Sequence, residues 1–358
     1  MPKVNTASVP ATFLTVQGLR GIAAVMVVVY HSLGLWALQI HTPVTGFWAN
    51  GQAGVDIFFV ISGFIMPLTI RRTGHAAADS LNFLRRRIER IYPLYWIVTT
   101  LKVALTLAVP AVAVYGLGSS YHVIASYLLL PSFHPDGSVT PIVPPGWTLT
   151  YEMFFYLLIT IGIACGRSLR WFMPAVLVPV ALLTFFPISH RIPIVRTELP
   201  LVLEFLAGMV LAWGVQRRPW LSKTLPNLII AVLAFSGILF LNDTSLSRVV
   251  VWGIPAFLLV GAALNMETKL GKRIPALMLL IGDASYSIYL LHWFMMPVVK
   301  HLEQMHRLAA IRSEASTVVL GVATSVVAGT CCYLWVERPI NRFFHVRRRT
   351  ALAAAKYI

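Results

Sequence analysis

Charged side chains are scarce in this chain of 358 residues. Asp, Glu, Lys and Arg make up 12% of it and hydrophobic residues 58%, whereas an average soluble domain is about 25% charged. This shortage excludes an ordinary water-soluble domain and indicates a lipid bilayer as the main solvent. Cysteine is rare too: Cys165, Cys331 and Cys332 lack the spacing of a metal site or a disulfide framework. We therefore expect no bound metal and interpret the three as small buried apolar residues.

Acidic residues are the scarcer charged type, with 13 Asp and Glu against 29 Lys and Arg, which gives a net charge of +16. Such an excess can indicate nucleic-acid binding. Here, however, the basic residues form short clusters between apolar runs, which is typical of the positive-inside pattern of membrane proteins and not of a basic groove. We therefore expect no nucleic-acid partner and interpret the basic clusters as facing membrane lipids.

Long apolar runs are what the chain has in abundance. A membrane-spanning helix needs about 20 mostly apolar residues. The runs that qualify are residues 19–38, 54–70, 91–109, 147–165, 171–187, 199–215, 225–241, 249–265, 277–299 and 316–336. The sequence thus predicts an all-α polytopic integral membrane protein with about ten transmembrane helices. It also predicts one membrane domain over residues 1–340, followed by a basic cytoplasmic tail over 341–358.

The distribution of Lys and Arg predicts the orientation of these spans. With a cytoplasmic N-terminus, 22 of these residues fall on the cytoplasmic side and six on the outer side. The positive-inside rule then places both termini in the cytoplasm. The longest loop, about residues 110–146, faces outward and carries no Lys or Arg. Within it, residues 122–130 indicate a short re-entrant or interfacial helix.

Ionisable residues inside predicted spans are costly and mark functional sites. His31 follows Arg20 by eleven positions, or about 16 Å along a helix axis. Similar arithmetic places His31, Asp56, Glu152 and His292 in one layer in the outer half of the membrane. Each of them alone could be structural. Together they predict a polar cluster for proton transfer, in which a carboxylate orients His31.

A second group of ionisable residues lies at the cytoplasmic mouth of the third predicted helix. Arg85, Arg86, Arg87 and Arg90 lead directly into Tyr92. Guanidinium groups bind phosphates through a bidentate fork. The cluster is consistent either with a plain positive-inside flank on lipid head groups or with a site for the phosphates of a nucleotide-bearing cofactor.

Six stretches together resemble the acyltransferase family 3 of integral membrane proteins. They are Gly18–Ala24 with His31, Gly54–Phe64, Arg86–Pro93, Trp147–Glu152, Ser285–His292 and Val336–Pro339. The resemblance implies ten core helices and transfer of an acyl group, usually acetyl, from cytoplasmic acyl-CoA (acetyl-CoA). The implied acceptor is a hydroxyl of a cell-envelope glycan or lipid-linked sugar. The chain looks like the stand-alone type, similar to the exopolysaccharide acyltransferases of soil bacteria, in the bacterial inner membrane.

The resemblance also implies roles for individual residues. Arg20 and His31 would be an essential pair, and Arg87 and Arg90 would match an Arg-x-x-Arg motif. The expected phosphate-binding residues for CoA are Arg20, Arg86, Arg87 and Arg90. The expected catalytic residues are His31, as general base or transient acyl carrier, with Glu152, Asp56 and His292. The expected sugar-stacking residues are Trp147, Tyr151 and Tyr156, for which an interfacial aromatic belt is the alternative.

Two other functions also need buried ionisable residues or a membrane anchor. A secondary transporter or flippase of lipid-linked sugar would show two repeated halves with broken helices, and the sequence shows no such repeat. A non-catalytic scaffold would not need polar residues at matching depth. The acyltransferase is therefore the preferred interpretation.

Overall fold

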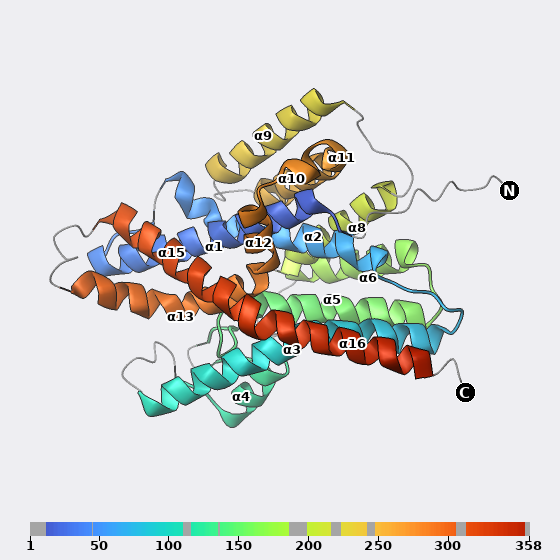
Figure 1. Cartoon of the computed structure of the whole chain (residues 1–358), viewed down its shortest axis with the longest axis horizontal. Coiled ribbons are helices and arrows are strands. Elements are labelled where there is room, and N and C mark those ends of the chain that lie inside the picture. Colours follow the sequence, from blue (N-terminus) through green and yellow to red (C-terminus); the bar gives the residue numbers. More distant parts are fainter. Residues whose placement is uncertain are drawn as a thin grey trace.

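The computed structural model describes residues 12–44, 46–109, 116–134, 137–185, 199–215, 223–241, 248–305 and 313–354. Every regular element in these ranges is helical, which confirms the predicted all-α class. The longer helices are α1 (Leu14–Ile40), α2 (Gly54–Leu68), α3 (Ala76–Ala108), α5 (Gly146–Ala164), α6 (Leu169–Leu182), α8 (Val202–Val215), α9 (Thr224–Phe240), α10 (Ile254–Asn265), α13 (Ser285–Gln304), α15 (Glu314–Cys332) and α16 (Arg338–Ala354) (Figure 1). The shorter elements are η1 (Phe47–Ala53), α4 (Ser120–Tyr127), η3 (Leu183–Phe185), η5 (Leu199–Leu201), the π-helix η6 (Val249–Gly253), α11 (Glu267–Leu270), η7 (Gly271–Arg273), α12 (Ala276–Asp283) and the π-helix η8 (Tyr333–Glu337).

Several of these helices are long and apolar enough to cross a membrane. In the described residues five qualify singly, and two further pairs qualify if each bent pair counts as one span. Helices α6, α8 and α9 are apolar but shorter than 18 residues. Large apolar side chains also point away from the protein, for example Leu107, Leu233 and Val319, each at least 65% exposed. Because water-soluble proteins rarely leave such surfaces open, the chain is a multi-pass membrane protein, and the number of ten spans stays a prediction.

Small residues let two helices of the centre approach closely. A side chain placed on Gly63 of α2 would lie 2.0 Å from the carbonyl oxygen of Phe205 in α8. A side chain on Gly208 of α8 would lie equally close to the carbonyl oxygen of Val60. Glycine at both positions brings the two backbones into contact, as in other tightly packed membrane helices. This contact fixes the rotation of α2, one of the walls of the site described below.

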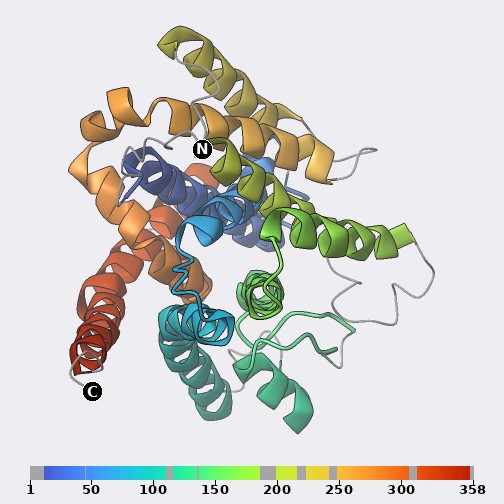
Figure 2. The same cartoon turned by 90° about the vertical axis from the view of Figure 1, so that its right-hand side faces the viewer.

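A bend in one helix pair and the run of three elements at the C-terminal end shape the rest of the molecule. The chain bends by 72° between α12 and α13, so α13 begins inside the protein. In contrast, α15, η8 and α16 follow one another along the length of the molecule (Figure 1). The domain boundary predicted at residue 340 falls within α16, and the residues after it continue that helix. Figure 2 shows α1, α2, α3, α5 and α13 arranged around the centre of the molecule.

Candidate functional site

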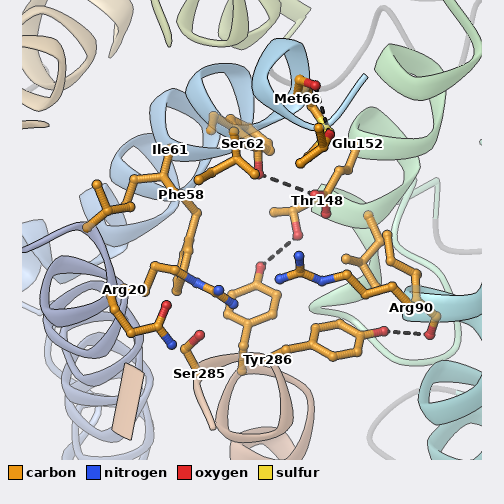
Figure 3. A pocket seen from close by; sticks show the side chains of 18 of the residues that line it. Arg20, Phe58, Ile61, Ser62, Met66, Arg90, Thr148, Glu152, Ser285 and Tyr286 are labelled. Atoms are coloured by element: carbon orange, nitrogen blue, oxygen red, sulfur yellow. Dashed lines mark hydrogen bonds between the residues drawn. The ribbon is translucent and has the colours of Figure 1, made fainter. Parts of the chain in front are cut away.

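A cavity of about 430 Å³ lies between α1, α2, α3, α5 and α13 (Figure 3). Helix α2 presents Val55, Phe58, Ser62 and Met66 to it, a spacing of three to four residues that defines one face of a helix. Most of the wall is apolar. The polar residues that line it, tyrosines included, are Thr12, Gln17, Arg20, Ser62, Thr69, Arg90, Thr148, Glu152, Ser285, Tyr286 and Tyr289.

Two arginines enter the cavity from opposite helices. Arg20 of α1 and Arg90 of α3 direct their guanidinium groups toward each other (Figure 3). Within the described residues, neither lies within 4 Å of a carboxylate oxygen. Two cations that face one another in a mostly apolar space repel. The carboxylates of Glu337, Glu152 and Asp283 act on Arg20 in the opposite sense, and Glu337 also acts on Arg90.

Glu152 lies in the same cavity. Its Oε1 atom accepts hydrogen bonds from Ser62 Oγ, at 3.2 Å, and from the hydroxyl of Tyr156. Arg87 stands behind this pair, with its guanidinium carbon 5.6 Å from the centre of the Tyr156 ring. Arg87 also donates to the hydroxyl of Thr69. The carboxylate of Glu152 is thus held on the arginine side of the site.

Thr148 and Tyr289 meet in the cavity wall, where their hydroxyl oxygens lie 3.0 Å apart (Figure 3). The ring of Tyr289 lies 5.9 Å from that of His292. The ring of His292 lies 4.8 Å from that of His31. Neither histidine lines the cavity. Tyr289 therefore lies between the cavity and a pair of adjacent histidines.

Backbone carbonyls set the tautomer of both histidines. His31 Nδ1 lies 2.9 Å from the carbonyl oxygen of Val27, and His292 Nδ1 lies 2.6 Å from that of Tyr289. A carbonyl only accepts, so a proton is assigned to Nδ1 in each ring and Nε2 is left as an acceptor. His292 Nε2 is buried and has no hydrogen-bond partner in the described part of the chain. The sequence prediction that these two histidines meet is confirmed.

The described structure does not bring Asp56 and Glu152 into contact with the two histidines, as the predicted polar cluster requires. Asp56 is fully buried in an ion pair, with its carboxylate 2.9 Å from Arg248 Nη2 and 3.2 Å from Arg248 Nε. Glu152 faces the arginines, as described above. Depth arithmetic counts rise along a helix but not rotation about its axis. Asp56 lies two residues before Phe58 and so points away from the cavity face of α2. The described contacts of His31 include a backbone carbonyl and no carboxylate.

Arg86, Arg87 and Arg90 of the predicted arginine cluster line one groove of about 800 Å³, whereas Arg85 does not. This basic groove is lined by Arg71, Arg86, Arg87, Arg90, Arg338, Arg342 and His345, together with neighbouring residues of α2, α3, η8 and α16. It shares Leu68, Thr69 and Arg90 with the cavity. The two spaces therefore adjoin, and a ligand could extend from one into the other.

The aromatic residues expected to stack on a sugar have other surroundings. Tyr151 and Tyr156 are 2% and 1% exposed, and neither lines the cavity. Trp147 packs edge-on against Phe59 and Tyr151. The expectation of an open stacking surface is therefore corrected for the two tyrosines, because both rings are enclosed in the core. Tyr156 instead holds Glu152.

Four polar residues of this region were not identified from the sequence: Ser62, Thr148, Ser285 and Tyr289. All four lie inside stretches that the sequence analysis had already compared with the family. The family resemblance could therefore have identified them as candidates, but their contacts depend on how the helices pack. Arg248, which pairs with Asp56, was not identified from the sequence either. No group of three or more His, Cys, Asp or Glu side chains suited to a metal ion occurs in the described residues.

Comparison with known proteins gives a consistent result. The family described as "Acyltransferase domain" matches residues 13–336. The chain is 33% identical to the "Exopolysaccharide production protein ExoZ" of Rhizobium meliloti (strain 1021), over 86% of this chain and 94% of that protein. It is 26% identical to the "Acyltransferase MdmB" of Streptomyces mycarofaciens, over 95% of this chain and 94% of that protein. It is 27% identical to the "Putative acetyltransferase ORF330" of Acidianus two-tailed virus, over 77% of this chain and 81% of that protein. No solved structure matches the chain significantly.

Proposed function

This chain belongs to the acyltransferase family 3, whose domain spans residues 13–336, and from that membership we propose that it moves an acyl group from cytoplasmic acyl-CoA to a hydroxyl of an exported or cell-envelope glycan. The family makes the chain an enzyme, an acyltransferase for groups other than amino-acyl groups. Membership also disfavours the transporter and the scaffold considered above. Acetyl is the proposed acyl group, and an exopolysaccharide is the proposed acceptor. The similarity to a protein named for exopolysaccharide production supports that acceptor.

The continuity of the basic groove with the cavity carries the proposed donor. Acyl-CoA is an anionic nucleotide with a long, mostly uncharged arm that ends in the thioester. The groove offers guanidinium groups for the nucleotide's phosphates. The cavity continues from it as a mostly apolar space, which suits the arm. Arg20 and His31 are about 16 Å apart along α1, and an extended pantetheine arm spans a similar length of about 15 Å by covalent geometry.

The histidine pair supports the proposed chemistry. In this proposal the Nε2 atom of His31 takes the proton of the acceptor hydroxyl while the hydroxyl oxygen attacks the thioester carbon. The carbon–sulfur bond breaks, and the CoA thiolate leaves and recovers the proton. Transient transfer of the acyl group to His31 is the alternative order of the same steps. The arm enters past Tyr289, so that side chain has to move for the thioester to reach the pair.

The topology is proposed with the same orientation as the charge distribution predicts. Ten helical segments of the described chain correspond to the ten apolar runs: five long helices, two bent pairs, and α6, α8 and α9. Both termini would lie in the cytoplasm of a bacterial inner membrane. The basic groove would then face the compartment that contains acyl-CoA.

The test combines a purified protein with a cell-based readout. Protein in detergent or nanodiscs should transfer or hydrolyse acetyl from acetyl-CoA, measured as released thiol. Mass spectrometry of envelope and secreted polysaccharides, with and without the gene, should show an acyl group that is lost on deletion. Thiol release with no change in any glycan would exclude the proposed acceptor, and the absence of both would exclude the proposed donor as well.

A further inference from the structure

Helix α15 packs closely against α13 (Figure 1), and two glycines of α15 fix the register of the pair. A side chain on Gly329 would lie 2.5 Å from the Cα atom of Ile288, and one on Gly321 would lie 3.8 Å from the Cε atom of Met296. Residue numbers fall along α15 as they rise along α13, so the two helices run antiparallel.

This register places Ser325 opposite His292. Ser325 stands midway between Gly321 and Gly329 in α15, and His292 stands midway between Ile288 and Met296 in α13. Residues four apart lie on one face of a helix. The buried residues of α15 all follow this spacing, and they are Thr317, Gly321, Ser325 and Gly329. The Ser325 side chain is therefore on the face of α15 that meets α13.

The two opposed side chains each contain a buried polar atom without a partner. Both residues are 0% exposed, and neither His292 Nε2 nor Ser325 Oγ has a hydrogen-bond partner in the described part of the chain. The carbonyls of Tyr289 and Ile288 engage the rest of the His292 ring, so Nε2 is left as an acceptor. Buried polar groups without partners are unfavourable and rare. Here an acceptor and a possible donor stand opposite each other on neighbouring helices.

Ser325 differs from other hydroxyl residues of these packed helices. Ser32 of α1 and Thr324 of α15 each donate to the carbonyl one turn back in their own helix, at 2.8 and 2.7 Å. A helix commonly satisfies Ser and Thr in this way. In the described structure the Ser325 hydroxyl makes no such bond. It is therefore available to donate across the helix interface.

The two histidines also differ in access. His31 is partly buried, whereas His292 is fully buried, and their rings lie 4.8 Å apart. An acceptor hydroxyl has to reach the base that takes its proton, which favours His31. His292 contributes by presenting a fixed ring against that of His31. A ring that is held at Nδ1 alone can still rotate, and a bond at Nε2 would prevent this.

We propose that Ser325 is a positioning residue whose hydroxyl donates a hydrogen bond to Nε2 of His292, directly or through one buried water. Ordered waters commonly join buried polar groups in this way. With both ring nitrogens engaged, His292 holds its orientation, and His31 supplies the nitrogen that takes the proton of the acceptor hydroxyl. The catalytic consequence rests on the proposed function, whereas the hydrogen bond itself does not.

The first experiment observes the hydrogen bond without any substrate. In purified protein with ¹⁵N-labelled histidine, the nitrogen chemical shifts report which ring nitrogens carry a proton or accept a hydrogen bond. The His292 signals are identified by their loss in His292→Asn. Ser325→Ala should shift the Nε2 signal of His292 toward that of a ring nitrogen without a hydrogen bond. Ser32→Ala is the matched control, because Ser32 is equally buried against α15 but bonds its own helix. It should leave this signal unchanged.

The second experiment is a double-mutant cycle on acetyl transfer from acetyl-CoA. Ser325→Ala should lower kcat about fivefold, the effect of one neutral hydrogen bond, and leave KM for acetyl-CoA unchanged. In the His292→Asn background, which lacks Nε2, the same substitution should have no further effect. Ser325→Cys keeps a weak donor of similar size and should retain part of the lost rate. Ser32→Ala should keep the kcat of each background.

The outcomes separate this inference from the proposed function. An Nε2 signal that moves in Ser325→Ala and not in Ser32→Ala supports the hydrogen bond even if the wild type turns over no acyl-CoA, in which case the proposed function alone fails. An unchanged Nε2 signal in Ser325→Ala overturns the bond. Equal losses of kcat in both backgrounds overturn the positioning role, because the effect would then not pass through His292. A raised KM for acetyl-CoA with unchanged kcat overturns it as well.

Discussion

At the scale of residues, the histidine pair shows how backbone geometry prepares a side chain for chemistry. The carbonyls of Val27 and Tyr289 each occupy Nδ1 of one imidazole. Both Nε2 atoms are thereby left as acceptors, and the rings lie 4.8 Å apart. The carbonyls thus perform the orienting task that the sequence analysis had assigned to a carboxylate.

His31→Ala should lower kcat for acetyl transfer by at least about a hundredfold, the lower range for removal of a general base. Expression and melting temperature should change little, because the His31 residue is only partly buried. His292→Asn keeps an amide near the position of Nδ1 and removes Nε2. It should retain the fold and lose part of kcat. Single-turnover kinetics with acetyl-CoA measures both effects, and full activity of His31→Ala would contradict the assigned role.

The ion pair of Asp56 and Arg248 is a second residue-scale feature, and its role is structural in this arrangement. Asp56→Ala should destabilise the protein by about 3–5 kcal/mol, the usual loss when one partner of a buried pair is removed. The cause is the Arg248 guanidinium, which stays buried without its counter-charge. Melting in detergent measures the loss. Removing both charges with Asp56→Leu and Arg248→Met should recover much of the stability, and a folded Asp56→Ala protein with normal stability but no activity would argue for catalysis instead.

At the scale of elements, close packing of α2 on α8 determines which side of α2 faces the cavity. Gly63→Ala should destabilise the protein strongly, because the added methyl would meet the Phe205 carbonyl at 2.0 Å, and backbone atoms cannot give way cheaply. Gly34→Ala in α1 is the control, since nothing lies within 4 Å of the added methyl. It should be neutral or slightly stabilising. Thermal melting of both variants checks the difference, and similar melting temperatures would show that the helices can separate without cost.

Helix α16 is the element whose role differs most from the sequence interpretation. Arg338 and Arg342 line the basic groove, whereas Arg347 on the same helix does not. Arg342→Gln should therefore raise KM for acetyl-CoA by about tenfold through one lost charged hydrogen bond. Arg347→Gln should leave it unchanged. Steady-state kinetics at low and moderate salt tests this, and equal effects of the two variants would reduce α16 to a membrane-surface helix.

At the scale of the whole molecule, the positive-inside pattern predicts that both termini lie in the cytoplasm. A fluorescent protein fused after residue 358 should fluoresce, and alkaline phosphatase fused there should be inactive, because both report a cytoplasmic end. A phosphatase fusion in the predicted outer loop, after Gly137, should be active. Both reporters are fused at both sites, and at each site one reporter should be active and the other inactive. An active phosphatase at the C-terminus would contradict the predicted orientation.

Much of this molecule was predictable from local sequence. Apolar run length, charge clusters and the six stretches predicted the helical membrane class and a polar cluster that contains His31 and His292. They also singled out Arg20, Arg90 and Glu152, although Glu152 was expected beside the histidines and lies on the arginine side. The short helix expected over residues 122–130 is observed as α4, Ser120–Tyr127. These features depend on residues close together in the chain or on the preference of apolar runs for a bilayer, and both can be evaluated from the sequence.

The tertiary structure decided what each polar residue faces. Asp56 pairs with Arg248, and Glu152 accepts a hydrogen bond from Ser62 on the arginine side. Tyr156 is buried in the core, and Ser285 lines the cavity at a helix break. Each outcome depends on how far a helix is rotated about its own axis, and that rotation is set by contacts such as Gly63 on Phe205 between segments distant in the chain. The sequence alone determined which side chains enter the membrane. Packing determined their partners, because a helix period places residues on a face without saying which neighbour that face will meet.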